Sequence, residues 1–142
     1  MGWDISVYVE VQRPGQSWAP VSFPGVEVGQ PPLSEPWNNR EKKVWGFLLG
    51  ANGRSAGWLD CEGYPSDTSQ PRSQYTYQPY QTFATLQQLR DLPWRDGEIG
   101  DDGGLGESLE GSGFHQMIHS MAMDAVAADY GADHVRLLIA VG

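Results

Sequence analysis

The sequence is poor in the features that stabilise or anchor proteins outside a reducing cytosol. Cys61 is its only cysteine, so no internal disulfide bond and no zinc site built from several thiolates can form. No stretch approaches the ~20 apolar residues of a membrane-spanning helix. The opening residues show neither the basic region nor the apolar run of a signal peptide. We therefore expect a cytoplasmic protein with no membrane partner.

Basic residues are also scarce. The chain has 9 Lys and Arg against 18 Asp and Glu, which gives a formal net charge of −9. A protein that binds duplex nucleic acid needs a surplus of Lys and Arg to displace counterions from phosphates. We therefore expect no duplex nucleic-acid binding, whereas a basic protein surface remains a plausible partner.

The common catalytic motifs are missing. The sequence has no Gly-x-Ser-x-Gly elbow, no phosphate-binding Gly-x-x-x-x-Gly-Lys and no pair of His-x-Thr/Ser motifs. The Gly-Gly-Leu-Gly at residues 103–106 lacks the preceding strand that a dinucleotide-binding loop needs. A pair of carboxylates acting as acid and base stays open, because such pairs have no fixed spacing. The expectation is a non-enzyme without a cofactor.

The length and composition predict one α+β domain over residues 1–142. Sixteen aromatic residues supply a core, and 18 glycines and 10 prolines predict long irregular loops. The first strand shows a period of two: Trp3, Ile5, Val7 and Val9 alternate with Asp4, Ser6, Tyr8 and Glu10. Residues 17–23 predict a second strand, which Pro20 places at an edge. The apolar run at residues 135–141 predicts a central strand covered on both faces.

Three helices are expected between these strands. The first covers residues 37–49, with Val44, Trp45, Phe47 and Leu48 facing inward, and ends at Gly50 and Gly53. The second is short and has Thr85 as its N-cap. Residues 54–81 between them are expected to be irregular. The last helix begins at Ser112 and ends at Gly131. We expect a two-layer fold in which the N- and C-terminal strands share one mainly antiparallel sheet, covered by the first and last helices.

Four segments, in this order, resemble an uncharacterised family of small tailed-phage and prophage proteins that open Met-Gly-Cys-Asp-Ile-His. The matching segments are residues 1–10, Arg40 with residues 44–50, residues 85–89 and residues 133–139. The family's opening Cys and His are Trp3 and Ser6 here, and its His-Ser-x-Ser-Trp segment is replaced at residues 81–84. The resemblance therefore implies a phage origin and a fold, and it transfers no functional residue.

His115 and His119 are four residues apart in the last helix, a spacing that places two imidazoles side by side. A zinc-protease helix would have Glu after the first His, and Gln116 stands there. A third metal ligand would have to be His134, Asp124 or Cys61. We expect no metal.

An acidic segment at residues 96–110 precedes the last helix and holds no Lys or Arg. It comprises Asp96, Glu98, Asp101, Asp102, Glu107 and Glu110. The calcium-binding EF-hand pattern fails there, because Asp101 replaces the required Gly. A solvated loop and a surface for a basic partner are the two interpretations.

Two sets of residues are candidates for an interface. In the last helix, Phe114, Met117, Ile118, Met121, Ala125 and Ala128 form the expected core stripe. The other side is also largely apolar, which makes His115, His119, Met123, Val126 and Tyr130 interface candidates, with a homodimer the simplest partner and the chain's own loops the alternative. In the irregular middle segment, Arg72, Tyr75, Tyr77 and Tyr80 are of the types favoured at binding sites.

These observations favour a phage accessory protein that inhibits or sequesters a host component, through binding a host protein or a small nucleotide. The alternatives are a small hydrolase acting on nucleotides or phosphodiesters, and a minor virion component.

Overall fold

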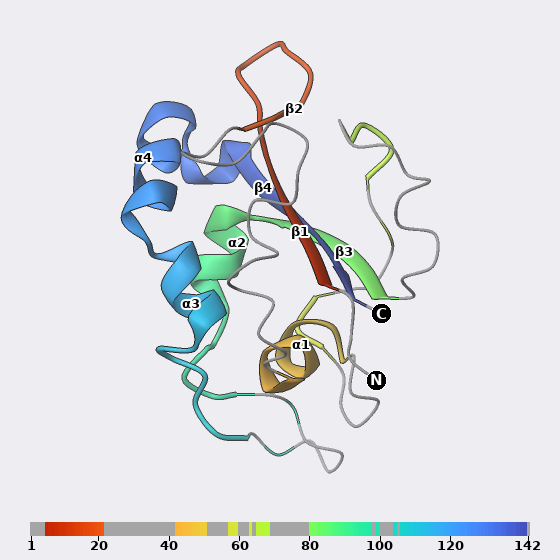
Figure 1. Ribbon diagram of the computed structural model, residues 1–142, viewed down its shortest axis with the longest axis vertical. Helices are drawn as coiled ribbons and strands as arrows, with labels where there is room; N and C mark the ends of the chain where they lie inside the picture. The colour runs from red at the N-terminus through yellow and green to blue at the C-terminus, as the bar shows by residue number, and fades with distance from the viewer. Residues whose placement is uncertain are drawn as a thin grey trace.

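The computed structural model describes residues 5–21, 42–50, 57–59, 63, 65–68, 80–97, 99, 104 and 106–141. These residues form an α+β fold with a four-stranded antiparallel sheet (Figure 1), as expected. Its elements, in chain order, are β1 (Ile5–Val11), β2 (Ala19–Pro20), α1 (Lys42–Leu49), β3 (Tyr80–Thr85), α2 (Leu86–Asp91), α3 (Gly113–Ile118), α4 (Met121–Tyr130), the 3-10 helix η2 (Ala132–His134) and β4 (Val135–Val141).

The sheet has the strand order β2-β1-β4-β3. β1 and β4 pair over their whole length, from Ile5 opposite Val141 to Val11 opposite Val135, so the N- and C-terminal strands share the sheet as expected. β2 lies at one edge with Pro20 in it, although only two residues of the expected strand pair with β1. β4 lies between β1 and β3 and is buried throughout its described side chains, which confirms it as a central strand.

β3 forms the other edge, and its first residues lie in a segment that was expected to be irregular. The prediction is wrong there because the small residues of this strand face the core, whereas a large aromatic residue faces outward. Thr82 and Ala84 face the core and are almost fully buried, whereas Phe83 on the outer face is 41% exposed. A pattern search that looks for large apolar residues facing inward does not find such a strand.

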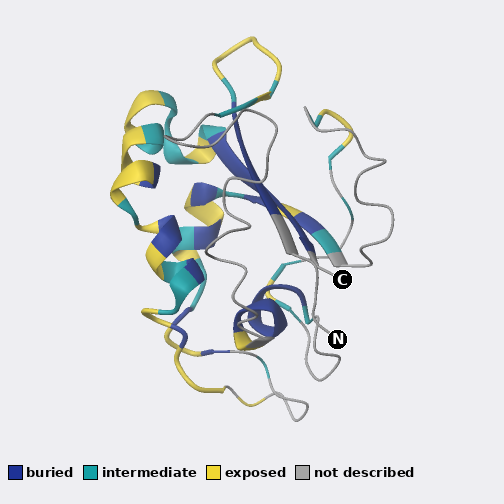
Figure 2. Cartoon of the chain, viewed as in Figure 1, coloured by how far each residue is buried: buried dark blue, intermediate teal, exposed yellow. Residues whose placement is uncertain are grey.

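The helices cover one face of the sheet and enclose the main core (Figures 1 and 2). Val44, Trp45, Phe47 and Leu48 of α1 are buried, as expected. Gly50 follows α1 with a φ of 66°, and its N–H bonds to the carbonyl of residue 46, so it ends the helix. Residues 37–41 lie outside the described residues. Within the described part of the chain, no helix is long and apolar enough to cross a bilayer.

The expected last helix is two helices, α3 and α4, separated by residues 119 and 120. Ser112 caps α3 by accepting a hydrogen bond from the backbone N–H of His115, as expected. α3 then ends at Ile118, and Ser120 begins α4 by accepting from the N–H of Met123. The extended backbone of Ser120 (φ −71°, ψ 161°) interrupts the helix. Of the α-helices in the described residues, α1 and α4 are the two longest, with 8 and 10 residues, in line with the two main helices that were expected.

This break changes which residues of α4 reach the core. Met123 is only 1% exposed, and Val126 and Tyr130 pack against the core. Met121 is 88% exposed, and Ala125 and Ala128 are also exposed. The expected core stripe is therefore wrong beyond Ile118, because a continuous helical period was extended across a cap. Met123 is a core residue and not an interface anchor.

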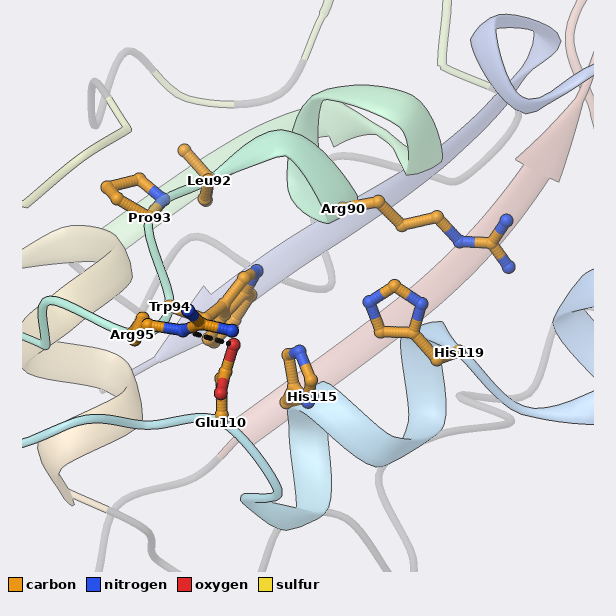
Figure 3. Close-up of a pocket in the computed structure, with 8 residues that line it drawn as sticks. All are labelled: Arg90, Leu92, Pro93, Trp94, Arg95, Glu110, His115 and His119. Atoms are coloured by element: carbon orange, nitrogen blue, oxygen red, sulfur yellow. Dashed lines mark hydrogen bonds and ion pairs between the residues drawn. The ribbon is translucent and has the colours of Figure 1, made fainter.

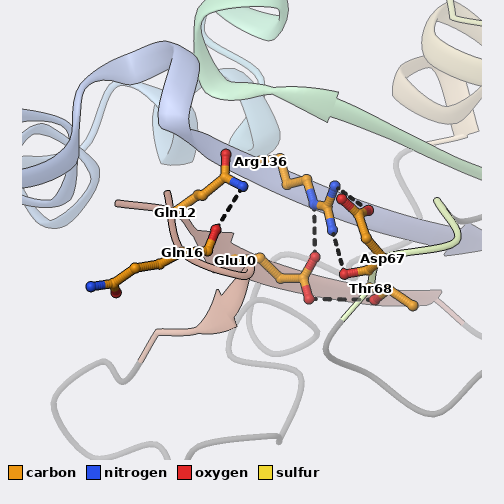
Figure 4. A network of polar contacts seen from close by, with 6 residues as sticks. All are labelled: Glu10, Gln12, Gln16, Asp67, Thr68 and Arg136. Carbon is orange, nitrogen blue, oxygen red and sulfur yellow. Dashed lines mark hydrogen bonds and ion pairs between the residues drawn. The ribbon is translucent and has the colours of Figure 1, made fainter. Parts of the chain in front are cut away.

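The second face of the sheet buries an ion pair. Arg136 of β4 lies opposite Glu10 of β1, and its Nε donates to Glu10 Oε1 at 2.8 Å (Figure 4). Arg136 Nη1 also donates to Asp67 at 3.0 Å, and its guanidinium lies 4.0 Å from the ring centroid of Trp18. Glu10 is fully buried, whereas the alternation in β1 predicted a polar, solvent-facing side. The prediction failed because the compensating charge is 126 residues away in sequence.

The break at Ser120 can be tested with two methionines on the same helix. We expect Met123→Ala to lower the free energy of unfolding by about 2 to 5 kcal/mol, because it leaves a cavity in the core. Met121→Ala is the matched control and should change it by less than about 0.5 kcal/mol. Urea denaturation followed by circular dichroism measures both. Similar losses at the two positions would contradict the break and favour one continuous helix.

Candidate functional site

A pocket of about 430 Å³ lies between the end of α2, the turn that follows it, and α3 (Figure 3). Its volume falls within the range of small-ligand sites. The residues that line it are Arg90, Leu92, Pro93, Trp94, Arg95, Glu110, His115 and His119. It therefore contains both histidines of the expected pair and one residue of the acidic segment.

Trp94 forms the rigid wall of this pocket. Its side chain is almost fully buried, and its indole Nε1 donates to the carbonyl of Leu89 at 2.7 Å. Its ring stacks on Phe47 at 4.5 Å and meets the imidazole of His115 edge-on at 5.4 Å. Its carbonyl accepts from the N–H of Leu109 at 2.7 Å. These contacts join α1, α2 and α3 around the pocket.

His115 is held in one tautomer by the backbone. The N–H of Gly111 donates to His115 Nδ1 at 3.1 Å, so in the neutral ring the hydrogen resides on Nε2. Burial lowers the pKa of His115 below its ordinary value, the nearby His119 lowers it further, and Glu110 opposes both. At neutral pH His115 is therefore a neutral imidazole whose Nε2–H is a hydrogen-bond donor without a lone pair for a proton.

His119 completes the histidine pair that the spacing predicts. The two ring centroids are 4.7 Å apart, and His119 is the exposed C-cap residue of α3. The described residues contain no group of three His, Cys, Asp or Glu arranged to hold a metal ion. His115 also has no lone pair to offer, because Nδ1 accepts from Gly111 and Nε2 carries the hydrogen. Cys61, a candidate third ligand, lies outside the described residues.

Two arginines contribute positive charge to the pocket, and they differ in role. Arg90 donates from Nε to the carbonyl of Ile118 and from Nη2 to Asp124, both at 2.8 Å, which ties α2 to the two helices after it. Arg95 is 81% exposed and donates from Nε to Glu110 at 3.1 Å. Sequence reasoning missed both arginines. The available signal was that they are the only basic residues between Arg72 and Arg136.

Two described glutamates of the acidic segment pair with basic side chains outside it. Glu107 accepts from Lys43 Nζ at 2.6 Å, and this contact lowers the pKa of the Glu107 carboxyl. Glu110 pairs with Arg95. Asp96 belongs to the turn after Trp94, where its N–H bonds to the carbonyl of Pro93. The remaining acidic residues, Glu98, Asp101 and Asp102, lie outside the described residues.

The other interface candidates do not gather at the pocket. Val126 and Tyr130 pack on the core from α4, and the ring of Tyr130 lies 4.4 Å below the guanidinium of Arg13. Tyr80 is the first residue of β3. Arg72, Tyr75 and Tyr77 lie outside the described residues. Of the interface candidates on the last helix, Met123 is therefore part of the protein's own core, and Val126 and Tyr130 pack against it.

Comparison with models of known protein families, with curated proteins and with solved structures found no match. The resemblance to the tailed-phage family accordingly stays a prediction.

The environment of His115 predicts a pH dependence of stability. Because its pKa is lower in the folded than in the unfolded chain, its contribution to stability is complete above its ordinary value of about 6.5. The contribution is lost as the pH falls from there through the lowered folded pKa. His115→Asn keeps an acceptor for the N–H of Gly111 without titrating. Urea denaturation at about pH 7.5 and about pH 5.5 measures the free energy of unfolding. Between these two pH values it should fall by more in the native chain than in the variant. An equal fall in the free energy of unfolding of both proteins would contradict the lowered pKa of His115.

Proposed function

We propose that this protein acts by binding, and that the pocket between α2 and α3 holds an anionic group of a host component. On this proposal it is a phage accessory protein that sequesters or inhibits its target, for example a component of a host defence system. The ligand is a small nucleotide or an acidic group on a host protein.

The observation that carries this proposal is the hydrogen bond from Gly111 to Nδ1 of His115. It leaves Nε2–H as a donor beside the two arginines and His119. Donors of this kind hold the oxygens of phosphates and carboxylates. In a chain with a net charge of −9, the pocket brings two arginines together, beside one carboxylate, Glu110.

The same hydrogen bond argues against the hydrolase alternative. A general base must present an unprotonated nitrogen to the proton that it removes. His115 presents Nε2–H, and the partner that would normally orient a catalytic imidazole, an acceptor for Nδ1–H, is replaced by a backbone donor. No specific observation favours a virion component. The homodimer stays a prediction, and Met123, one of its expected anchors, is in the core.

The binding proposal predicts that adenosine 5′-monophosphate binds and that uncharged adenosine binds far more weakly. A typical binding free energy of about 0.3 kcal/mol per non-hydrogen atom of the ligand places the dissociation constant of the nucleotide on the order of 10 µM. His119→Ala and Arg95→Gln should each weaken binding about fivefold to thirtyfold, because each removes a charge-assisted hydrogen bond. Isothermal titration calorimetry measures these constants.

Arg13→Gln is the matched control for Arg95→Gln. Arg13 is also exposed and paired with a carboxylate, Asp129, but it does not line the pocket. Its substitution should leave the constant unchanged. The bound nucleotide should also remain intact for hours. Phosphate release that disappears in His115→Gln would replace the binding proposal with the hydrolase.

A further inference from the structure

The pocket contains a carboxylate that already binds one of its arginines. Glu110 accepts from Arg95 Nε at 3.1 Å, and the two side chains are 46% and 81% exposed. Water and salt screen an ion pair with this exposure, so it contributes little to stability. Among the described residues, Glu110 is the only partner of Arg95. This pair can therefore be exchanged without disturbing the fold.

The backbone that carries Glu110 is held in place on both sides. The N–H of Leu109 bonds to the carbonyl of Trp94 at 2.7 Å, and the N–H of Ser112 bonds to the carbonyl of Leu109 at 3.1 Å. Gly111 donates to His115 Nδ1, and its carbonyl accepts from Gln116 at 2.7 Å. Rotation of the Glu110 side chain alone is therefore enough to release Arg95.

Arg90 does not have this freedom. Its side chain is 19% exposed, and its Nε and Nη2 are bound to the carbonyl of Ile118 and to Asp124. If Arg90 bound a ligand instead, α2 would lose its hydrogen bonds to Ile118 at the end of α3 and to Asp124 in α4. Arg95 is thus the guanidinium of the pocket that can change partners.

We infer that Glu110 is an internal competitor for the ligand, and that its carboxylate holds the place on Arg95 that a phosphate monoester takes. This inference rests on the proposed function. An external carboxylate gains little over Glu110, because Glu110 has the same chemistry and is tethered beside Arg95. A phosphate monoester carries a charge near −2 and three oxygens, which can accept from Arg95, from His115 Nε2–H and from His119 together. The contact with Glu110 therefore selects phosphate esters over carboxylates.

The test compares two glutamates of the same segment. Glu110→Gln and Glu107→Gln make the same change in net charge, and each breaks one exposed ion pair, but only Glu110 lines the pocket. Calorimetric titrations of the full chain use adenosine 5′-monophosphate and, separately, acetate. We expect Glu110→Gln to bind the nucleotide about threefold to fivefold more tightly, because no internal anion competes. Glu107→Gln should change the constant by less than about twofold, because Glu107 does not line the pocket and its exposed charge is screened by salt. Acetate should bind measurably only to Glu110→Gln.

The double variant Arg95→Gln, Glu110→Gln completes the cycle. If Glu110 acts through Arg95, the double variant binds the nucleotide as weakly as Arg95→Gln alone. Equal tightening by Glu110→Gln and Glu107→Gln would show that only the overall charge matters, which overturns the inference and leaves the proposed function standing. Acetate binding to the native chain as tightly as the nucleotide would overturn the selection of phosphate. Absence of nucleotide binding to every form would overturn both.

Discussion

The side chain of Trp94 joins the core of the protein to its pocket. One face of the ring stacks on Phe47 of α1, the indole nitrogen bonds to the carbonyl of Leu89 in α2, and the ring edge meets His115 of α3. Its own carbonyl fixes Leu109, and with it the turn that presents Glu110 and the N–H of Gly111. A buried aromatic ring with all of these contacts has one position, and the geometry of the pocket follows from that position.

The opposite face of the sheet depends on a buried charge pair. Glu10 and Arg136 are cross-strand neighbours in β1 and β4, so their attraction acts only when these two terminal strands pair in the observed register. Removing Arg136 would take from the fully buried Glu10 carboxylate the guanidinium that lies 2.8 Å away, which is strongly destabilising at a buried site. The pair thus specifies the register that brings the ends of the chain together, and the helices of the other face, with the pocket between them, are built on that sheet.

The features that depend on neighbouring residues were predictable from the sequence. Ser112 and Thr85 cap helices as expected, Gly50 ends one, and the apolar run at the C-terminus is the central strand. The predictions that failed have one of two causes. Either two local signals compete at one residue, or the partner of a residue lies far away in the sequence. Ser120 is compatible with a helix interior and with a cap, and choosing the former reversed the roles of Met121 and Met123. Arg95 lies in the turn after α2, directly after the buried Trp94, and neither helical nor strand periodicity carries information about a residue in a turn.

The central claim is that His115 presents a hydrogen-bond donor to the pocket and not a base. Its most direct test is the tautomer of this imidazole in the full chain at neutral pH, read from long-range proton–nitrogen correlations in a nuclear magnetic resonance spectrum. The hydrogen bond from Gly111 predicts the Nε2–H form, with Nδ1 in the chemical-shift range of an acceptor nitrogen. A ring found in the Nδ1–H form would expose a basic Nε2 to the pocket and contradict the account.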